Sequence, residues 1–269
     1  MTPSVERFAS CWIGPRLNPL GHACVASFLA HGFGFDLHTF ERVADVPAAA
    51  TLHDATAILP PEEVFVAHGG LETATEQFAY RYLRDRGGWV VDLDVHCNAD
   101  TVPATPIAYA EEKPGRINNA VLKFPPGHGA VYELLDYCAT IDPVTAPWGS
   151  TGPLALTKVF GRRADLKPYR LPMNQVYPIH WREAPKLLFA EFTDEICTRV
   201  ARSPFVHLWG STLREIGLRS DARPPLGSYL DLIYSRYIDP ALLQRLHPAD
   251  EELLRDMIPK YIARNWPKP

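Results

Sequence analysis

The sequence lacks the cysteine pattern of a disulfide framework or a zinc site. Its five cysteines are odd in number and widely spaced, and no C-x-x-C pair occurs among them. Such a pattern points to a reducing compartment, of which the cytosol is the natural example. We therefore expect a cytoplasmic protein whose cysteines are not paired.

A basic bias and long apolar runs are also absent. The formal net charge is -4 and no cluster of lysine and arginine stands out, whereas a nucleic-acid binder usually carries a basic patch. No eighteen apolar residues occur in a row, and residues 1–10 show no basic segment followed by an apolar run. We expect no nucleic-acid partner, no transmembrane helix and no secretory signal.

Several common catalytic motifs are missing as well. The sequence has no G-x-x-x-x-G-K-[ST], H-E-x-x-H or G-x-S-x-G, so nucleoside triphosphatases, zincins and common α/β-hydrolases lack support. Gly32 and Gly34 begin a dinucleotide-binding fingerprint, but Leu37 takes the place of its third glycine. The glycines also precede an expected strand instead of following one, so the fingerprint fails.

Strands and helices are expected to alternate along the chain. The 269 residues, 46% of them hydrophobic, suffice for one α/β domain with a helical elaboration. Apolar runs and turn residues predict strands at 8–13, 35–40, 89–91, 106–110, 120–124 and 205–209, and helices at 19–30, 73–86, 129–139, 151–160 and 240–263. This alternation predicts a largely parallel sheet.

The most informative segment is G-G-W-V-V-D-L-D at residues 87–94. Residues two apart in a strand point to the same side, so Asp92 and Asp94 are expected to converge at the carboxyl end of the strand, where α/β sheets bind ligands. Two adjacent carboxylates repel each other unless a cation joins them, and Mg²⁺ or Mn²⁺ suits oxygen ligands. The alternative is that one carboxylate caps a turn and the other is merely solvated.

Several motifs together resemble a known family. C-W-I-G at 11–14, S-F-L-A-H-G at 27–32, D-A-T-A-I-L-P at 54–60 and the D-x-D strand are similar to glycosyltransferase family 32, with a looser likeness at 152–157 and 207–209. Its relatives include α-1,4-glycosyltransferases, bacterial capsular and lipo-oligosaccharide enzymes and, more distantly, clostridial toxin glucosyltransferase domains. The resemblance implies an α/β, GT-A-like nucleotide-sugar-binding fold with a mainly parallel sheet and a helical C-terminal extension.

The resemblance also implies an activity and a division of the chain. It implies a metal-dependent retaining glycosyltransferase that uses Mn²⁺ or Mg²⁺. The enzyme would move a sugar from a nucleoside-diphosphate donor, in first place a UDP-sugar, to a glycan or glycolipid acceptor in bacterial surface-polysaccharide synthesis. We expect a single domain over 1–269, with a nucleotide-sugar-binding half at 1–100, an acceptor-binding and closing half at 101–237 and a helical tail at 238–269.

Site residues are carried over from the resemblance by position. The catalytic residues would be Asp92, Asp94 and Glu76, the donor-binding residues Trp12, Asp92, Asn118, Asn119, Gly152 and Trp209, and the metal ligands Asp94 and His207. Alternatives stay open for several of them: core packing for the two tryptophans, a turn for the asparagines, and a capping box with Thr73 for Glu76.

The helix before the double glycine departs from the family pattern S-D-x-x-R-Y. Residues 75–80 read T-E-Q-F-A-Y, so Glu76 keeps the acidic charge but Ala79 removes an arginine that contacts the diphosphate in the family. Arg81 points roughly 200° away from Ala79 around a helix and does not substitute for it; Lys123 is a candidate replacement. The rival hypothesis is a catalytically impaired nucleotide-sugar or glycan-binding protein on the same fold.

The tail has an amphipathic helical pattern. One side of the expected helix carries Leu253, Leu254, Met257, Ile258, Tyr261 and Ile262, and its end is basic. Docking of the apolar side on the parent domain is favoured over contact with an anionic membrane surface. The second arrangement would place the protein peripherally at the inner face of the membrane.

Overall fold

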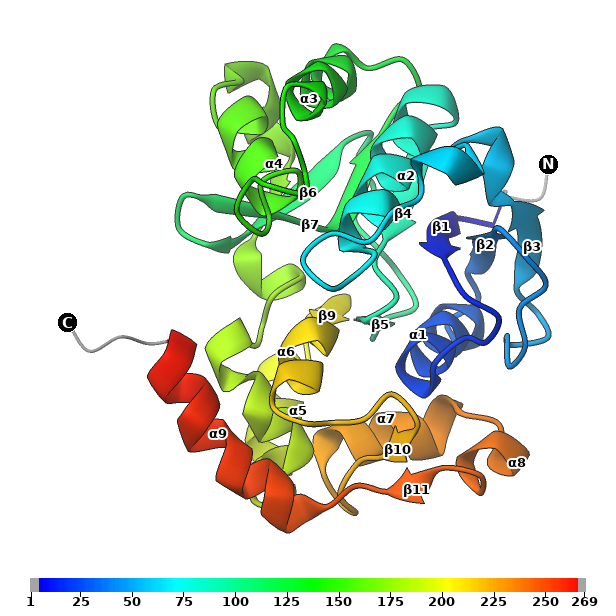
Figure 1. Ribbon diagram of the computed structural model, residues 1–269, viewed down its shortest axis with the longest axis vertical. Helices are drawn as coiled ribbons and strands as arrows, with labels where there is room; N and C mark the ends of the chain where they lie inside the picture. The colour runs from blue at the N-terminus through cyan, green and yellow to red at the C-terminus, as the bar shows by residue number, and fades with distance from the viewer. Residues whose placement is uncertain (1–4, 266–269) are drawn as a thin grey trace.

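A seven-stranded sheet forms the centre of the molecule (Figure 1). The computed structural model describes residues 5–265. The strand order is β3-β2-β1-β4-β7-β6-β8, and the strands are β1 Arg7–Trp12, β2 Gly34–Thr39, β3 Thr51–Asp54, β4 Gly88–Val91, β6 Ala108–Lys113, β7 Arg116–Phe124 and β8 Arg170–Leu171. The expected strands at 8–13, 35–40, 89–91, 106–110 and 120–124 are thus found, with shifted ends, and β3 and β8 are additional.

Most neighbouring strands in this sheet run parallel. β1 pairs in parallel with β2 and β4, β2 with β3, and β6 with β8. β7 runs antiparallel to both of its neighbours, β4 and β6. Only two residues join β6 to β7, one of them Gly115 at φ +77°, and such a short connection allows only an antiparallel pair. The expectation of an α/β fold with a mainly parallel sheet is confirmed.

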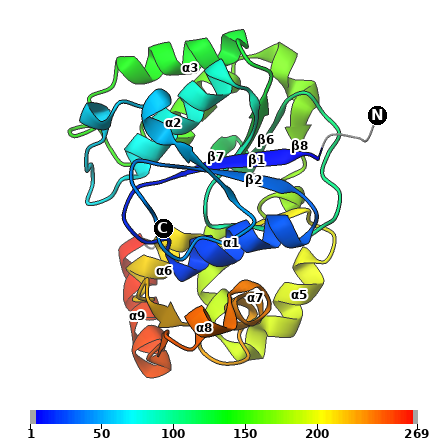
Figure 2. The same ribbon diagram turned by 90° about the vertical axis from the view of Figure 1, so that its right-hand side faces the viewer.

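Helices cover both faces of the sheet (Figure 2). On one face lie α2 Glu72–Asp85, α3 Gly129–Ala139 and α4 Pro153–Phe160; on the other lie α1 Pro19–Ala30 and the C-terminal helices. Each face has its own hydrophobic core, one including Leu134 and Phe160, the other Phe8, Phe28 and Phe205. A ligand site can therefore form at the carboxyl ends of the parallel strands, in the space between the two helical layers.

The second half of the chain builds most of the layer on the α1 side. Its helices after α4 are α5 Thr193–Val200, α6 Gly210–Glu215, α7 Tyr229–Tyr237, α8 Pro240–Leu243 and α9 Glu251–Asn265. Within residues 5–265, turns of 3₁₀ helix lie at Ala55–Ala57, Pro61–Glu63, Ala164–Tyr169, Met173–Gln175, Trp181–Leu188 and Ala190–Phe192. A two-stranded antiparallel sheet of β5 Val95–Cys97 and β9 Phe205–His207 joins the two halves of the chain.

The expectation of one helix over 240–263 is wrong. α8 ends at Leu243, His247–Pro248 forms β11 beside β10 Ala222–Arg223, and α9 begins only at Glu251. Pro248 explains the break, because it has no amide hydrogen and disfavours helical backbone in the residue before it. Asp250 then caps the next helix by accepting a hydrogen bond from the Leu253 amide at 3.0 Å.

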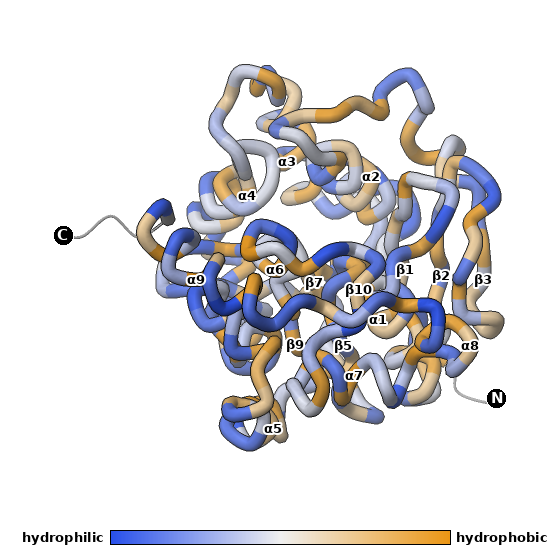
Figure 3. The backbone as a smooth tube through the Cα atoms, turned by 60° about the horizontal axis from the view of Figure 1, so that its bottom comes forward, coloured by the Kyte–Doolittle hydropathy of each residue, from blue (hydrophilic) through white to orange (hydrophobic). Residues whose placement is uncertain are grey.

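α9 packs on the parent domain through part of the expected apolar side. Leu254 and Tyr261 are buried, whereas Leu253 and Ile262 are exposed. Hydrophobic and hydrophilic residues alternate along this helix (Figure 3). Docking on the domain is thus what the structure shows for this side of the helix, and membrane contact stays a prediction.

The cysteines of the described chain are free thiols. Four of the five are buried and Cys197 is exposed. Among the helices of residues 5–265, none combines the length and the apolar character needed to cross a membrane. Residues 266–269, which the expected tail included, lie outside the described residues.

Candidate functional site

The candidate site lies at the carboxyl ends of the parallel strands β1 and β4. Trp12 is the last residue of β1, and Asp92 directly follows β4. Gly87 and Gly88 adopt φ angles of +67° and +89°, which lets the chain leave α2 and turn sharply into β4. The double glycine thereby directs β4, and the aspartates that follow it in the sequence, toward the ligand-binding edge of the sheet.

A turn brings the two carboxylates of the D-x-D together. β4 ends at Val91, and the Val95 amide donates a hydrogen bond to the Asp92 carbonyl oxygen at 3.1 Å. The expectation that Asp92 and Asp94 share one side of a strand is wrong, because the chain has left the strand before Asp94. The convergence itself is confirmed, since oxygens of the two carboxylates lie within 4.8 Å of each other.

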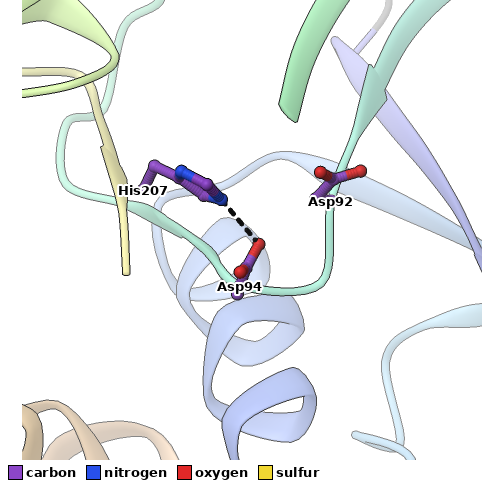
Figure 4. Close-up of side chains that lie close together, drawn as sticks. All are labelled: Asp92, Asp94 and His207. Carbon is purple, nitrogen blue, oxygen red and sulfur yellow. Dashed lines mark hydrogen bonds and ion pairs between the residues drawn. The ribbon is translucent and has the colours of Figure 1, made fainter. Parts of the chain in front are cut away.

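His207 joins the carboxylates from the other half of the chain (Figure 4). It ends β9 opposite Val95, and its Nε2 lies 3.1 Å from Oδ1 of Asp94. One ligand atom from each of Asp92, Asp94 and His207 lies within 4.8 Å of the other two. The Gly210 amide donates to Oδ2 of Asp94 at 2.7 Å, so both oxygens of this carboxylate are held in place.

These three groups fit a divalent cation. Two carboxylates and an imidazole are ligands that Mn²⁺ accepts. Two ligand atoms about 2.1 Å from an ion and at right angles stand about 3 Å apart, which matches the 3.1 Å between His207 and Asp94. Packing fixes the imidazole, because the rings of Trp209 and Tyr177 lie 4.1 and 5.6 Å from it.

Burial and neighbouring charges set the protonation of this cluster. Burial and the charge of Asp94 raise the pKa of Asp92. Burial acts on Asp94 in the same direction, but His207 and the Gly210 amide outweigh it and lower the pKa of Asp94. Burial disfavours the cation of His207, yet the two aspartates outweigh it and raise the pKa of His207. Without a bound cation, Asp94 and His207 therefore form an ion pair. A cation would take the place of the proton on Nε2 of His207 and would relieve the repulsion that Asp92 meets.

Glu76 faces the site and does not cap α2. The helix begins at Glu72 without a side-chain cap, so the capping box with Thr73 is wrong. Oε2 of Glu76 instead accepts a hydrogen bond from the Thr151 hydroxyl at 2.7 Å. Burial, opposed by this bond and reinforced by Asp92, raises the pKa of Glu76 to about 8. At neutral pH, Glu76 is therefore a protonated carboxyl that can donate a hydrogen bond.

Gly152 leaves room for the Glu76 carboxyl. A Cβ atom at Gly152 would collide with Oε1 of Glu76 and lie 3.2 Å from Oδ1 of Asn119. The neighbouring Thr151 is fixed through its carbonyl oxygen, which accepts a hydrogen bond from the Tyr80 hydroxyl at 3.0 Å. Side chains from α2 and β7 thus meet the segment that leads into α4 at this carboxyl.

Asn118 and Asn119 both lie inside β7, so the turn alternative is wrong for them. Asn118 is buried; its Nδ2 donates to Glu112 at 2.7 Å, and its Oδ1 accepts from the Tyr177 hydroxyl at 3.1 Å. Asn119 is half-buried and lies against Gly152. Donor binding stays a prediction for both residues, and the geometry favours Asn119.

The two tryptophans of the expected donor site differ in their surroundings. Trp209 is 5% exposed, and its Nε1 donates to the Ile179 carbonyl oxygen at 2.8 Å. This placement corresponds to the core-packing alternative, and donor binding by Trp209 stays a prediction. Trp12 is half-buried, and its Nε1 is buried without a hydrogen-bond partner among residues 5–265. The N–H of Trp12 thus has neither a partner in the described part of the chain nor access to solvent, and only part of the ring is exposed.

No arginine of α2 replaces the one missing at position 79. Ala79 packs half-buried beside the core of its layer, and Arg81 forms an ion pair with Glu63. Lys123, the candidate replacement, lies opposite the first half of β4 and pairs with Glu6 at 2.8 Å. The suggestion of Lys123 is therefore wrong, because its charge lies at the end of β4 away from the aspartates.

Sequence reasoning missed two residues that shape the site. Thr151 acts through its hydroxyl on Glu76, and Gly210 acts through its amide on Asp94. Thr151 directly precedes Gly152, which the family resemblance indicated, so a signal next to it was present. A backbone amide leaves no trace in residue type, so nothing in the sequence pointed to Gly210.

Comparison with known proteins finds a likeness in structure and none in sequence. No family model matches the chain, and no curated protein matches it. Among solved structures, the chain is similar to the PaToxG glycosyltransferase, with 10% sequence identity and a TM-score of 0.46, over 60% of this chain and 69% of that chain. A likeness of this size carries no conclusion about the chain, and membership of glycosyltransferase family 32 stays a prediction.

Proposed function

We propose that the chain is a metal-dependent retaining glycosyltransferase that moves a sugar from a nucleoside diphosphate to a glycan or glycolipid. The observation that carries this proposal is the meeting of Asp92, Asp94 and His207 at the carboxyl edge of the sheet, in an arrangement that fits a divalent cation. A cation at such a place supplies charge stabilisation to a departing diphosphate.

In the proposed reaction, the bond between the anomeric carbon and a diphosphate oxygen breaks. A bond from an acceptor hydroxyl oxygen to that carbon forms, and the hydroxyl proton leaves on the diphosphate. Glu76 donates a hydrogen bond to a donor-sugar hydroxyl, in an orientation that Thr151 fixes. Asp92 accepts hydrogen bonds from ribose or sugar hydroxyls, and Asp94 and His207 would hold Mn²⁺ or Mg²⁺.

The proposed donor is a UDP-sugar whose base borders Trp12. The position of Trp12 at the carboxyl end of β1, next to the parallel strand β4 that leads into Asp92, supports this placement. The proposed setting is bacterial surface-polysaccharide synthesis at the cytoplasmic face of the membrane. Six tryptophans occur in the chain, so quenching of fluorescence by UDP must be compared between the wild type and Trp12→Phe to assign the base to this residue.

The acceptor is proposed to stack on Trp148, which is 56% exposed in an ordered turn. The Ser150 amide and hydroxyl both donate to the Pro147 carbonyl oxygen, at 3.1 and 2.6 Å, and Gly149 has φ +78°, as in a type II turn. Trp148 and Thr151 are three positions apart in the sequence, so their Cα atoms are at most about 11 Å apart. A rigid aromatic surface this close to the catalytic carboxyl suits the apolar face of an acceptor sugar ring.

Donor hydrolysis without an acceptor tests the proposed activity. UDP-glucose, UDP-galactose, UDP-N-acetylglucosamine and GDP-mannose are incubated with the protein and Mn²⁺ or EDTA, and the released nucleoside diphosphate is measured. We expect turnover of at least one donor that requires Mn²⁺ and falls by roughly 100-fold or more in Asp94→Asn. Asp256→Asn, which removes a surface carboxylate paired with Lys260 on α9, is the matched control and should keep the wild-type rate.

Two results would contradict the proposal. Equal turnover in the wild type and Asp94→Asn would show that the metal site is misassigned. Tight binding of a nucleotide sugar without turnover would favour the rival hypothesis, a catalytically impaired nucleotide-sugar or glycan-binding protein. That hypothesis is based on Ala79, which stands where the family has an arginine.

The acceptor site is tested separately. Trp148→Ala should leave donor hydrolysis unchanged but weaken transfer to lactose or maltose, and unchanged transfer would remove Trp148 from the acceptor site.

A further inference from the structure

The face of α2 that meets the site carries two acids and no cation. Glu72 and Glu76 are one helical turn apart and therefore share a face of α2. Glu76 lies on the Thr151 side of the site, and Glu72 is close enough for its charge to disfavour ionisation of Asp92. A diphosphate entering between these carboxylates needs a positive group besides a metal ion.

That positive group stands on α6, on the opposite side of the D-x-D. Gly210 begins α6 and donates its amide to Asp94 at 2.7 Å. Arg214 follows one turn later, so it lies on the same side of α6 as Gly210. Its Nη2 donates to Oε1 of Glu72 at 2.7 Å. This ion pair joins α6 to α2 across the aspartates.

The ion pair is open to water and therefore easy to exchange. The side chain of Arg214 is 55% exposed and that of Glu72 is 42% exposed. Exposed pairs of this kind contribute little to stability, because water solvates both charges well. A guanidinium binds phosphate oxygens through two parallel hydrogen bonds, which a single contact with an exposed glutamate does not match.

We propose that Arg214 is the cation that binds the donor diphosphate, and that it leaves Glu72 for the phosphate oxygens when the donor enters. This inference rests on the proposed function, because it assigns one more residue to the same donor site. Glu72 then acts as a placeholder: it keeps Arg214 at the mouth of the site and competes with the phosphate for it. The two members of one ion pair should consequently affect binding in opposite directions.

Binding of inorganic pyrophosphate in the presence of Mn²⁺ tests this pair without requiring knowledge of the base or the sugar. Calorimetric titration of Arg214→Gln should show affinity roughly 10- to 100-fold weaker than wild type, the usual size of a charge-assisted contact. Glu72→Gln should tighten binding by up to about fivefold, because the competitor is gone. Arg214→Lys should lie between wild type and Arg214→Gln.

Arg219→Gln is the matched control, because Arg219 follows α6 and pairs with the neighbouring Asp221 at 2.8 Å. It should bind pyrophosphate like the wild type, and melting curves of all four variants should match the wild-type curve. Wild-type affinity in Arg214→Gln would overturn the inference, as would weakening in Glu72→Gln, which would mean that the ion pair only supports the fold.

The failure of this inference can be told apart from failure of the proposed function. If the wild type binds pyrophosphate and hydrolyses a donor while both variants behave like it, the enzyme stands and Arg214 has no role in it. If the wild type binds neither pyrophosphate nor UDP with Mn²⁺, both proposals fall together.

Discussion

The contact between Gly152 and Glu76 determines the orientation of the Glu76 carboxyl in the site. In Gly152→Ala, the new Cβ occupies the place of Oε1 of Glu76, so the carboxyl must turn and lose its bond to Thr151. We expect donor turnover to fall by roughly 10-fold or more, since a misplaced catalytic group is costly, while the protein stays folded. Donor hydrolysis and a melting curve on the same sample measure both effects.

Gly129→Ala provides the matched control for this substitution. Gly129 is the first residue of α3, and a Cβ there meets no atom within 4 Å. The control should keep the wild-type rate. Equal rates in both variants would show that Glu76 does not need its present orientation.

His38 makes stability depend on pH in a range where most histidines are already charged. It is buried on β2, its ring stacks on that of His53 at 4.8 Å, and its Nδ1 has no partner among the described residues. Burial and the neighbouring His53 lower the pKa of His38 to about 4, against about 6.5 in an unfolded chain. The unfolded chain thus takes up a proton first as pH falls. Above about pH 6.5, His38 is neutral in both states and the folded protein keeps its full stability. Between about pH 6.5 and pH 4, the free energy of unfolding falls as the pH is lowered, because only the unfolded chain binds the proton.

His38→Phe tests this dependence, because it keeps an aromatic ring and removes the proton-binding site. The free energy of unfolding of the wild type should fall more steeply than that of the variant between pH 6.5 and 4, by up to about 1.4 kcal/mol per pH unit. Urea unfolding at a series of pH values gives this slope. A constant difference between the two proteins across that range would mean that His38 is not held neutral.

The sequence predicts the parts of the site that side chains form better than the parts that backbone groups form. Asp92, Asp94 and His207 were predicted from residue type and motif, and the structure brings them together. The predicted reason was wrong for the aspartates, because a hydrogen bond from Val95 closes a turn that alternation of side chains does not anticipate. The amide of Gly210 was not predictable, since every residue but proline has one.

Among the secondary-structure elements, local sequence signals predicted the helices, whereas the pairing of strands distant in sequence was not predicted. The helix expected at 19–30 matches α1, and that at 129–139 matches α3, because apolar spacing and the flanking turn residues mark both. The pairing of β5 with β9 joins segments more than a hundred residues apart. Short strands of this kind carry no mark of their partner, so the register that places His207 beside Asp94 had to come from the structure.

α9 offers two adjacent leucines that separate docking from solvent exposure. Leu254 is 1% exposed, whereas Leu253 is 50% exposed. Leu254→Ala should lower the free energy of unfolding by about 2–4 kcal/mol, and Leu253→Ala should change it by no more than about 0.5 kcal/mol. Urea unfolding of the two variants measures the difference. Equal effects would mean that the helix does not dock through Leu254.

At the scale of the whole molecule, a bound cation should hold the two halves of the chain together. Its expected ligands come from the turn after β4 and from the end of β9, so unfolding of either half would release it. At a concentration 100 times its dissociation constant, Mn²⁺ should raise the free energy of unfolding by about 2.7 kcal/mol. Ca²⁺ should stabilise less, because it prefers oxygen ligands to imidazole.

His207→Gln should abolish most of this stabilisation by Mn²⁺, as measured by melting curves with and without the ion. His247→Gln changes an exposed histidine of β11 and is the control. Equal stabilisation of both variants would remove His207 from the metal site.

The separation of Asp94 and His207 by 113 residues has a consequence for how the protein is made. On the ribosome, the D-x-D is synthesised long before β9, and contacts between segments so distant in sequence form late in folding. A nascent chain that has completed the strands around Asp92 still has two solvated carboxylates there and no imidazole beside them. If the proposed activity holds, the chain therefore acquires the ability to consume a nucleotide sugar only after β9 has been synthesised, so products truncated before β9 cannot consume the donor.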